Sequence, residues 1–335
     1  MTSPAPAAGR ALESARSALR ASLGNRVRTA GPDRTEALAM DGVPLVEHAA
    51  VMLVGGALRV IDVPPPSAAT FEGFLDGIQR SSTVAYVDGV PLLHGTAAAA
   101  IRERSADGRM RTWRQASVEH AVYASRALLG EETWRQLEAI LSARGQSVRD
   151  SDDQLPVPSR HPSALLRQGL DALSRVRNDL ERAMGGAWCD AHAERPLYVD
   201  GSLRTSRAML DSDGAVGVVK SHATLYVPDD VLPRVAALEA GQRTSVIAAL
   251  DGSERPRFFT WYLRLRNAAG RDPFFGLIRA ETGVRDDHAA TVEARADDVS
   301  AWLLAERSPL AKPDARWDVM PYAIRDCEVY LRAVA

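Results

Sequence analysis

The sequence predicts an α/β protein: a mixed sheet flanked by helices, with a helical insertion between the two halves of the sheet. Three observations support this fold class. Valine-rich apolar runs typical of strands occur in both halves of the chain, and longer segments with helical periodicity separate and follow them. With 335 residues, of which 46% are hydrophobic, the chain is also long enough to bury a full core.

Composition narrows the class of protein. The formal net charge is −2, which excludes nucleic-acid binding through bulk positive charge and leaves only local patches. The two cysteines, Cys189 and Cys327, lie far apart, so neither a disulfide framework nor a structural zinc site is expected, and Cys327 is interpreted as a small buried residue. The N-terminus does not resemble a signal peptide, and no apolar run approaches the length of a membrane span. We expect a cytoplasmic protein.

The first 66 residues are predicted to be an N-terminal extension before a single domain over residues 67–335. We expect residues 1–10 to be disordered and residues 11–24, which end in a glycine, to form a helix. The valine-rich segment 44–63 indicates one or two strands before a run of three prolines.

Three strands follow in quick succession. We expect the first at 71–80, the second at 83–87 and the third from residue 90. Asp88-Gly89 between two apolar runs is a strong hairpin signal. The sequence therefore predicts an antiparallel meander with an aspartate, Asp76, on its first strand.

The helical insertion is expected at about 114–185. Its first helix is predicted over 114–144, followed by a polar loop over 145–162. A second helix, 163–185, has leucines on one face and is expected to end at Gly185-Gly186.

The second half of the chain is predicted to return to the sheet and then to end in two helices. Strands are expected at 197–200, 214–222, 224–227, 257–266 and 274–281, and helices at 287–306 and 321–334. A meander, then helices, then another strand carrying an acid is compatible with an RNase H-like core.

Two strands carry the same motif, an aspartate followed by glycine. The motif is Asp76-Gly77 after one apolar run and Asp200-Gly201 after another. A carboxylate at the end of a buried strand is fixed in position and open to a ligand, and two side by side begin an Mg²⁺ or Mn²⁺ site. Because Asp-Gly is also a common turn dipeptide, Asp88-Gly89 and Asp251-Gly252 are interpreted as turns only.

From about residue 70 to the C-terminus, the chain resembles the NurA nuclease family. Five elements carry the resemblance in the right order: Asp76-Gly77, Pro196–Leu203, Gly217–Ser221, the pair Trp261–Leu265 and Leu277–Glu281, and Met320–Ile324. The chain departs from the family at Ile78, where a serine is usual, and in the last helix, where Asp326 and Cys327 stand near the position of a histidine.

The resemblance implies an RNase H-like, metal-dependent nuclease that uses Mn²⁺, or Mg²⁺, to hydrolyse DNA phosphodiesters. It further implies single-stranded endonuclease and 5′–3′ exonuclease activity in DNA end processing or defence. A homodimer that docks on a hexameric HerA-type ATPase is implied as well. The alternative is an inactive or weakly active adaptor that recruits a partner ATPase to DNA, which Ile78 and Asp326 favour.

The resemblance also assigns the site residues. Asp76 and Asp200 would be the central metal ligands and catalytic carboxylates. Glu181 stands where the family has a helical glutamate; its alternative is an ion pair with a nearby arginine, in which case Glu119 would be the ligand. Asp326 would replace the missing histidine as a metal ligand, because a carboxylate suits Mn²⁺ or Mg²⁺ as well as an imidazole does.

Lys220 is one of only two lysines among 41 basic residues, so a lysine here is less easily an accident of composition. Its compact charge suits a scissile phosphate or a transition-state charge. Two other polar residues are weaker candidates. His222 is typical of a strand end, and Glu281 either binds metal or pairs with Arg264 on the adjacent strand.

A local basic patch is the candidate DNA-binding surface. Residues 101–114 hold five arginines against two acids, and a tryptophan in the segment could stack on a base. The alternative is ordinary solvated surface. The candidate DNA contacts are Arg102, Arg104, Arg109, Arg111, Trp113 and Arg114.

Overall fold

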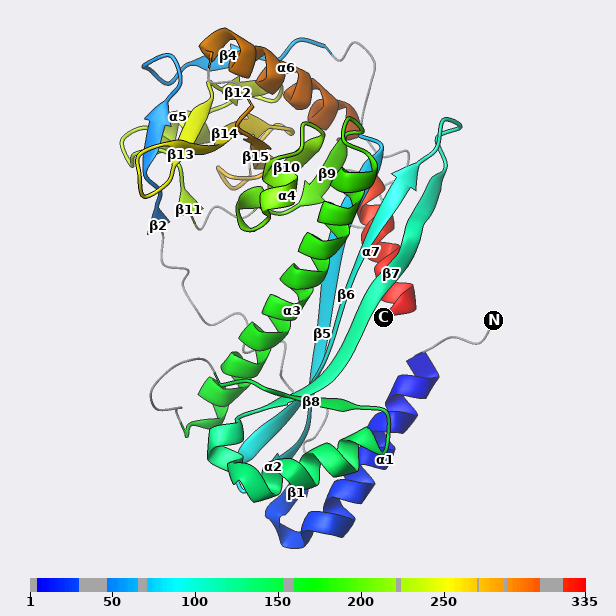
Figure 1. Ribbon diagram of the computed structural model, residues 1–335. Helices are drawn as coiled ribbons and strands as arrows, with labels where there is room; N and C mark the ends of the chain where they lie inside the picture. The colour runs from blue at the N-terminus through cyan, green and yellow to red at the C-terminus, as the bar shows by residue number, and fades with distance from the viewer. Residues whose placement is uncertain are drawn as a thin grey trace.

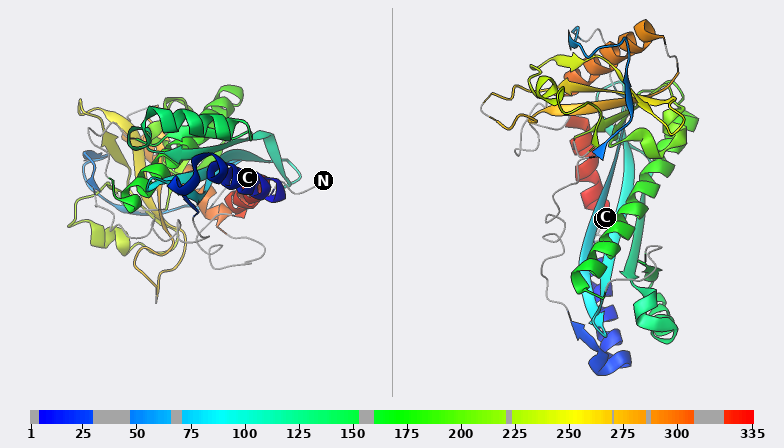
Figure 2. Two further views of the ribbon diagram at one scale, coloured as in Figure 1. Left: turned by 90° about the horizontal axis from the view of Figure 1, so that it is seen from below. Right: turned by 90° about the vertical axis from the view of Figure 1, so that its left-hand side faces the viewer.

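The computed structural model describes residues 5–29, 47–65, 71–152, 160–220, 224–269, 271–285, 288–307 and 322–335. The molecule is elongated: a compact head carries a long arm built from three strands and one long helix (Figure 1). Figure 2 shows the same arm from the side, with helices on both faces of its strands. A large mixed sheet runs through head and arm. The predicted class, a mixed α/β sheet flanked by helices, is therefore confirmed.

The arm is a meander of three strands of 15 residues each, β5 (Gly73–Val87), β6 (Val90–Arg104) and β7 (Met110–Ala124). Neighbouring strands pair antiparallel, as predicted. Asp88 and Gly89 form the first turn with φ of 48° and 84°, the left-handed backbone that suits these two residue types. The two strands expected at 71–80 and 83–87 are one strand, in which a register shift near Thr83 replaces the expected break.

The helix predicted over 114–144 is wrong in its first part. Residues up to Ala124 belong to β7, and the helix α2 spans only Arg126–Ser142, with Ser125 as its N-cap. Val118 and Val122 are four residues apart, which fits one face of a helix, but an even spacing also fits one face of a strand. Pairing with β6 decides between the two, so the helical insertion begins at α2.

The other strands continue the sheet into the head. The strand order is β3-β13-β14-β15-β10-β9-β5-β6-β7-β8, with β1, β4 and β12 paired beside this path and β2 with β11 apart. The bounds are β1 (Val27–Thr29), β2 (Glu47–His48), β3 (Val51–Leu53), β4 (Val60–Asp62), β8 (Ser147–Asp150), β9 (Leu197–Asp200), β10 (Ala215–Val219), β11 (Thr224–Leu225), β12 (Gln242–Thr244), β13 (Ile247–Leu250), β14 (Pro256–Arg264) and β15 (Leu277–Gly283).

Helices cover both faces of the sheet (Figure 1). The longest, α3 (Pro162–Ala191), packs along the arm, and α7 (Tyr322–Val334) packs on β5 and β6 from the opposite face. The remaining helices are α1 (Ala5–Leu23), α4 (Arg207–Leu210), α5 (Leu232–Ala236) and α6 (Ala289–Glu306), with short 3₁₀ turns η1 (Gly24–Arg26) and η3 (Leu203–Thr205). No helix within the described ranges is both long and apolar enough to cross a membrane.

Two predicted helix boundaries are wrong. Residues 5–10, expected to be disordered, are the start of α1. Gly185-Gly186 does not end α3, which continues to Ala191. Gly185 is needed for packing rather than for a stop, because a Cβ there would overlap Met209 and approach Leu75.

One interruption in the sheet positions the site. The parallel strand β9 pairs with β5 only at Gly73, Phe74 and Leu75, and β9 then ends at Asp200. β5 continues, and among the described residues it gains no new neighbour on this side until β1 pairs with it at Ala85. We call this place beside β5, just beyond the end of β9, the notch.

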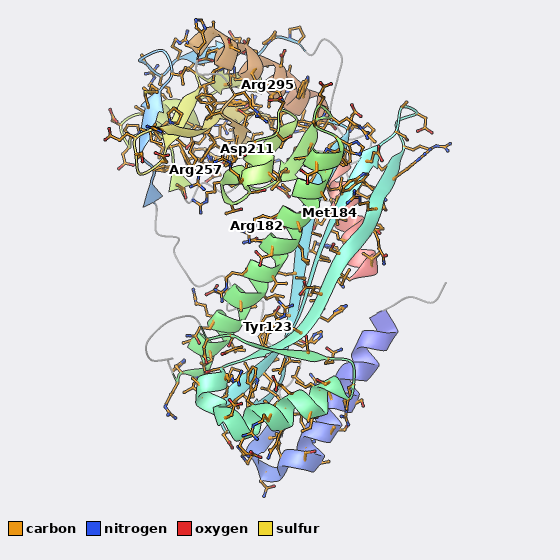
Figure 3. All side chains as sticks on the ribbon, viewed as in Figure 1. Tyr123, Arg182, Met184, Asp211, Arg257 and Arg295 are labelled. Atoms are coloured by element: carbon orange, nitrogen blue, oxygen red, sulfur yellow. The ribbon has the colours of Figure 1, made fainter. Side chains whose placement is uncertain are left out.

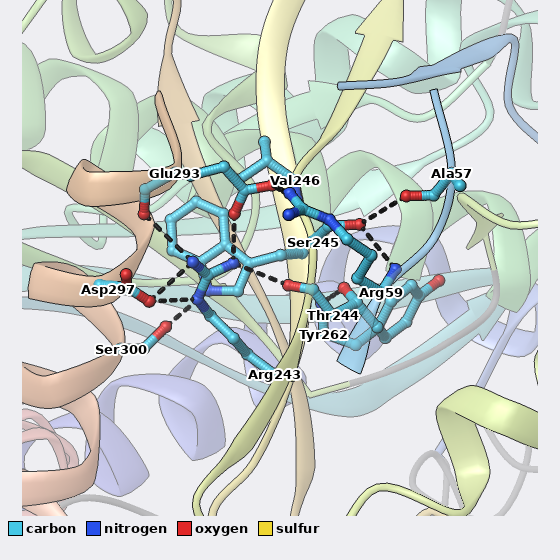
Figure 4. Close-up of polar contacts among 11 residues, drawn as sticks. Ala57, Arg59, Arg243, Thr244, Ser245, Val246, Tyr262, Glu293, Asp297 and Ser300 are labelled. Carbon is cyan, nitrogen blue, oxygen red and sulfur yellow. Dashed lines mark hydrogen bonds and ion pairs between the residues drawn. The ribbon is translucent and has the colours of Figure 1, made fainter. Parts of the chain in front are cut away.

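A buried ion-pair network holds α6 to the sheet (Figure 4). The guanidinium of Arg243 on β12 is fully buried; Nε lies 2.8 Å from Oδ1 of Asp297 and Nη1 lies 2.7 Å from Oε2 of Glu293. Arg59 reaches the same Glu293 at 3.1 Å, but its side chain is 57% exposed. Removing one partner of a buried pair strands the other charge, whereas exposed pairs contribute little.

We therefore expect Arg243→Met to lower the free energy of unfolding by about 3 kcal/mol. The matched control, Arg59→Met, removes the exposed arginine from the same carboxylate and should cost less than about 1 kcal/mol. Urea denaturation of both variants measures the difference. Equal losses would mean that burial of Arg243 does not set the strength of this network.

Candidate acidic site

Asp76 and Asp200 lie level with each other on neighbouring strands. The parallel register places Leu75 opposite Val199, so the next residue of each strand is an aspartate. Asp200 is the last residue of β9, as predicted, but Asp76 is the fourth residue of a long strand rather than its end. Asp76 nonetheless lies beside the end of a strand, because the neighbouring strand β9 stops at this level and leaves the notch.

The turn after Asp200 is held by a buried carboxylate. Gly201 has φ of 142°, a backbone conformation that side-chain-bearing residues rarely adopt. Beyond it, the hydroxyl of Ser202 and the backbone N–H of Leu203 each donate to Oε2 of Glu281 at 2.8 Å. Glu281, fully buried on β15, also pairs with Arg279. Glu281 is thus a positioning residue for the loop that carries Asp200.

The expected partner of Glu281 was Arg264, and this alternative is wrong. Arg264 is itself fully buried, and its guanidinium donates to four backbone carbonyl oxygens, those of Ala236, Leu238, Pro273 and Phe275. Burial lowers the pKa of Arg264. It closes the loops next to β14 and takes no part in the acidic site.

Glu181 reaches the notch from α3. Its carboxylate lies against the backbone of Gly77, where any Cβ would overlap it. Oε1 of Glu181 is 3.4 Å from Nε of Arg177, an ion pair that is not aligned as a hydrogen bond. The two glycines of the repeated motif therefore act differently: Gly77 leaves room for a helical carboxylate, and Gly201 turns the chain.

Burial and mutual repulsion perturb the acids. Burial, followed by the charge of Asp200, raises the pKa of Asp76 well above its usual range, although Lys220 opposes the shift. Burial raises the pKa of Glu181 to about 7; Arg177 lowers it and Asp200 adds to it. Carboxylates crowded in this way favour a bound cation or a proton.

Lys220 supplies one such cation. Its Nζ lies 2.7 Å from Oδ2 of Asp200, at the end of β10. The three acids and this lysine line one cavity of about 470 Å³. The cavity wall also includes Arg177, which the sequence offered as the ion-pair partner of Glu181, and three charged or amide side chains that were not identified from the sequence: Asn178, Arg182 and Arg204.

A sequence signal for part of this wall exists. Arg177, Asn178, Glu181 and Arg182 follow the i, i+1, i+4, i+5 spacing of one helical face. Nothing in the sequence says which face of α3 meets the notch, so the spacing alone could not separate a cavity wall from solvated surface.

Two of the predicted ligands lie elsewhere. Asp326, on α7, has its Oδ2 2.7 Å from Nε of Arg102. Glu119 was expected on a helix but lies on strand β7, where it pairs with Arg149 of β8. Neither lines the cavity that holds Asp76 and Asp200. His222 falls outside the described residues.

The predicted basic patch forms the tip of the β6–β7 hairpin, and half of it is engaged within the protein. Arg102 binds Asp326, and Arg104 binds both carboxylate oxygens of Glu306 at 2.6 and 2.7 Å. Trp113 is half-buried, edge-on to Trp188 with ring centroids 5.2 Å apart. The exposed members are Arg109, Arg111 and Arg114, of which Arg114 stacks over Trp113.

The residues of the cavity match a divalent cation in kind. Carboxylate oxygens are the ligands that Mg²⁺ and Mn²⁺ prefer, and Asp76, Asp200 and Glu181 converge on one cavity. Within the described ranges, however, no three His, Cys, Asp or Glu side chains are already grouped closely enough to hold a metal ion. Asp200 and Glu181 face Lys220 and Arg177 instead, so metal binding would require these side chains to rearrange.

Comparison of the sequence with protein-family models and with curated proteins finds no match.

The raised pKa of Glu181 predicts a pH dependence of stability. A carboxyl group that titrates near 7 in the folded protein and near 4.5 when unfolded holds its proton only in the folded state between these values. Its contribution is therefore complete below pH 4.5 and is lost as the pH rises to 7.

We expect Glu181→Gln, in EDTA, to be more stable than the wild type at pH 8 by up to about 3 kcal/mol, and to lose this advantage near pH 4.5. Denaturation across the pH range measures it. Glu132→Gln, at an exposed position of α2, is the control, and its stability relative to the wild type should not change with pH in this way. A constant difference between Glu181→Gln and the wild type at all pH values would contradict the assignment.

Proposed function

We propose that this protein is a divalent-metal-dependent deoxyribonuclease with an RNase H-like core. The observation that carries the proposal is the register of β5 and β9, which sets Asp76 and Asp200 side by side at the notch. Glu181 and Lys220 share their cavity. Three carboxylates can hold a metal that activates water, and a lysine can stabilise charge in the transition state of phosphodiester hydrolysis.

Asp76, Asp200 and Glu181 would hold Mn²⁺ or Mg²⁺. The bound metal would supply an activated water and neutralise charge on the scissile phosphate. Asp76 and Asp200 are fixed by the sheet and by the loop anchored on Glu281, so they define where the phosphate must sit. Gly77 keeps the approach of Glu181 open.

Lys220 would stabilise negative charge on the phosphate, and Glu181 would transfer protons. The ammonium of Lys220, beside Asp200, can turn to a non-bridging phosphate oxygen and stabilise the charge that develops there. Glu181, with a pKa of about 7, can take or give a proton at neutral pH. Arg177, Arg182 and Arg204 on the cavity wall make the site attractive to a phosphodiester rather than to a neutral substrate.

The finer parts of the proposal are carried by the family resemblance alone. They are single-stranded endonuclease and 5′–3′ exonuclease activity in DNA end processing or defence, a homodimer, and docking on a HerA-type hexameric ATPase. A ligand role for Asp326 would require Arg102 to release it.

A second candidate, an inactive or weakly active adaptor that recruits a partner ATPase to DNA, is favoured by one observation. Asp326, the residue expected to replace a histidine ligand, is paired with Arg102. Calorimetry with Mn²⁺ separates the two candidates. A nuclease binds the ion at Asp76 and Asp200, whereas an adaptor needs no tight metal site.

Asp76→Asn and Asp200→Asn should each fold, lose Mn²⁺ binding and lower DNA cleavage by about 100-fold or more, because each removes a ligand charge worth several kcal/mol. The matched control is Asp88→Asn, which alters an Asp-Gly pair in the hairpin turn at the far end of the arm. Cleavage of labelled single-stranded DNA measures the effect. Near wild-type cleavage by either folded site variant would place the active site elsewhere.

Cleavage should need added divalent metal and be faster with Mn²⁺ than with Mg²⁺. Mg²⁺ demands stricter octahedral geometry and loses water reluctantly, and here the carboxylates must first leave Lys220 and Arg177. Rates in Mn²⁺, Mg²⁺ and EDTA test this, and cleavage that persists in EDTA would contradict it.

A further inference from the structure

A second hollow adjoins the acidic cavity. It has a volume of about 460 Å³, and the two share Arg204 and Thr205 on the turn η3. The remaining wall comes from α4, the turn before β14, the start of β14 and the segment after β15: Arg207, Leu210, Asp211, Asp251, Pro256, Arg257 and Val284. The two hollows therefore lie next to each other, on either side of Arg204 and Thr205, and we call them together the groove.

The acids of the second hollow are already satisfied. Oδ2 of Asp211 lies 2.5 Å from Nε of Arg207, one turn earlier on α4. Asp251 accepts backbone N–H groups from Ser253 and Arg255 at 2.7 and 3.1 Å, and these bonds lower its pKa. Both carboxylates therefore have partners other than Arg204.

Two arginines remain open to a ligand. In the described part of the chain, the guanidinium of Arg204 forms no interaction. Arg257 donates to the backbone carbonyl oxygen of Arg204, which ties the two residues together, and it otherwise meets only the charge of Asp251. Figure 3 shows Arg182 on α3, and Asp211 and Arg257 on the adjoining part of the head.

We propose that a single nucleic-acid strand leaves the acidic cavity along this groove, with Arg204 binding the phosphate next to the scissile one and Arg257 a phosphate beyond it. The proposal rests on the proposed nuclease function. Guanidinium groups match phosphate oxygens with two parallel hydrogen bonds. A flexible strand can follow two joined hollows, whereas a stiff duplex cannot bend into them.

The groove would also account for DNA binding by a protein whose own net charge is only −2. Arg102 and Arg104 of the hairpin tip are paired with Asp326 and Glu306. The unpaired positive charge beside the acids is instead at the groove. The groove therefore predicts recognition of a strand segment on one side of the cleaved bond, and weak recognition of a diester too short to reach Arg257.

The test is binding of a labelled 12-nucleotide oligothymidylate in EDTA, followed by fluorescence anisotropy over a range of salt concentrations. The double variant Arg204→Gln/Arg257→Gln should bind about tenfold more weakly per arginine, the scale of one hydrogen bond to a charged group. The slope of log K against log[salt] should become shallower by about 1.4, which is 0.7 for each lost phosphate contact. Arg135→Gln, an exposed arginine on α2, is the matched control and should change neither value.

A second variant, Arg109→Gln/Arg111→Gln/Arg114→Gln, tests the hairpin tip. A wild-type affinity and salt slope in the groove variant, or losses confined to the hairpin variant, would overturn the groove. Cleavage assays keep this result distinct from the proposed function. If the wild type cleaves no DNA in Mn²⁺ yet the groove variant loses binding, the nuclease proposal fails and the groove stands. If the wild type cleaves DNA and the groove variant binds normally, the nuclease proposal stands and the groove proposal fails.

Discussion

The parallel pairing of β5 with β9 is short, and the rest of the site depends on that shortness. Three residues of each strand pair, and β9 then ends while β5 continues. Buried backbone groups normally require partners, so a strand left without a neighbour marks a place where something else must fill the space. Here side chains of α3, of β9 and of the end of β10 line the space, and they include Glu181, Asp200 and Lys220.

Separate parts of the fold support the members of the site. Asp200 depends on β15, because Glu281 holds the turn that follows it. Glu181 depends on α3 and on the missing side chain of Gly77. Lys220 depends on β10, which pairs with both β9 and β15. The three acids repel one another, and the ion pairs with Lys220 and Arg177 offset only part of this repulsion, so packing elsewhere also holds the acids together.

The sequence predicted the class of fold and singled out Asp76 and Asp200 as a pair, because both inferences depend on local pattern. An apolar run, the Asp88-Gly89 turn and each Asp-Gly pair can all be recognised within a few neighbouring residues. The failures involve partners distant in sequence. Val118 and Val122 fit a helix and a strand equally well, and only pairing with β6 decides between them.

The same limit applies to side-chain roles. Glu281 was expected to bind metal or to pair with Arg264, because its hydrogen bonds to Ser202 and Leu203 span almost eighty positions and leave no local trace. Arg102 and Trp113 were interpreted as ligands for DNA because nothing in their own segment shows Asp326 or Trp188. A sequence shows only how many basic residues a segment contains. Whether those residues are free to bind a ligand depends on their partners in the folded protein.

The length of α3 has a mechanical consequence. Its 30 residues form a rod of about 45 Å. Leu165 near one end packs in the core shared with α1 and α2, and Trp188 near the other packs beside β9. Glu181 rides on this rod, whereas Asp200 is fastened to the sheet. The separation of these two carboxylates is therefore set by how both ends of α3 are packed, and the far end of the arm contributes to it through the length of one helix.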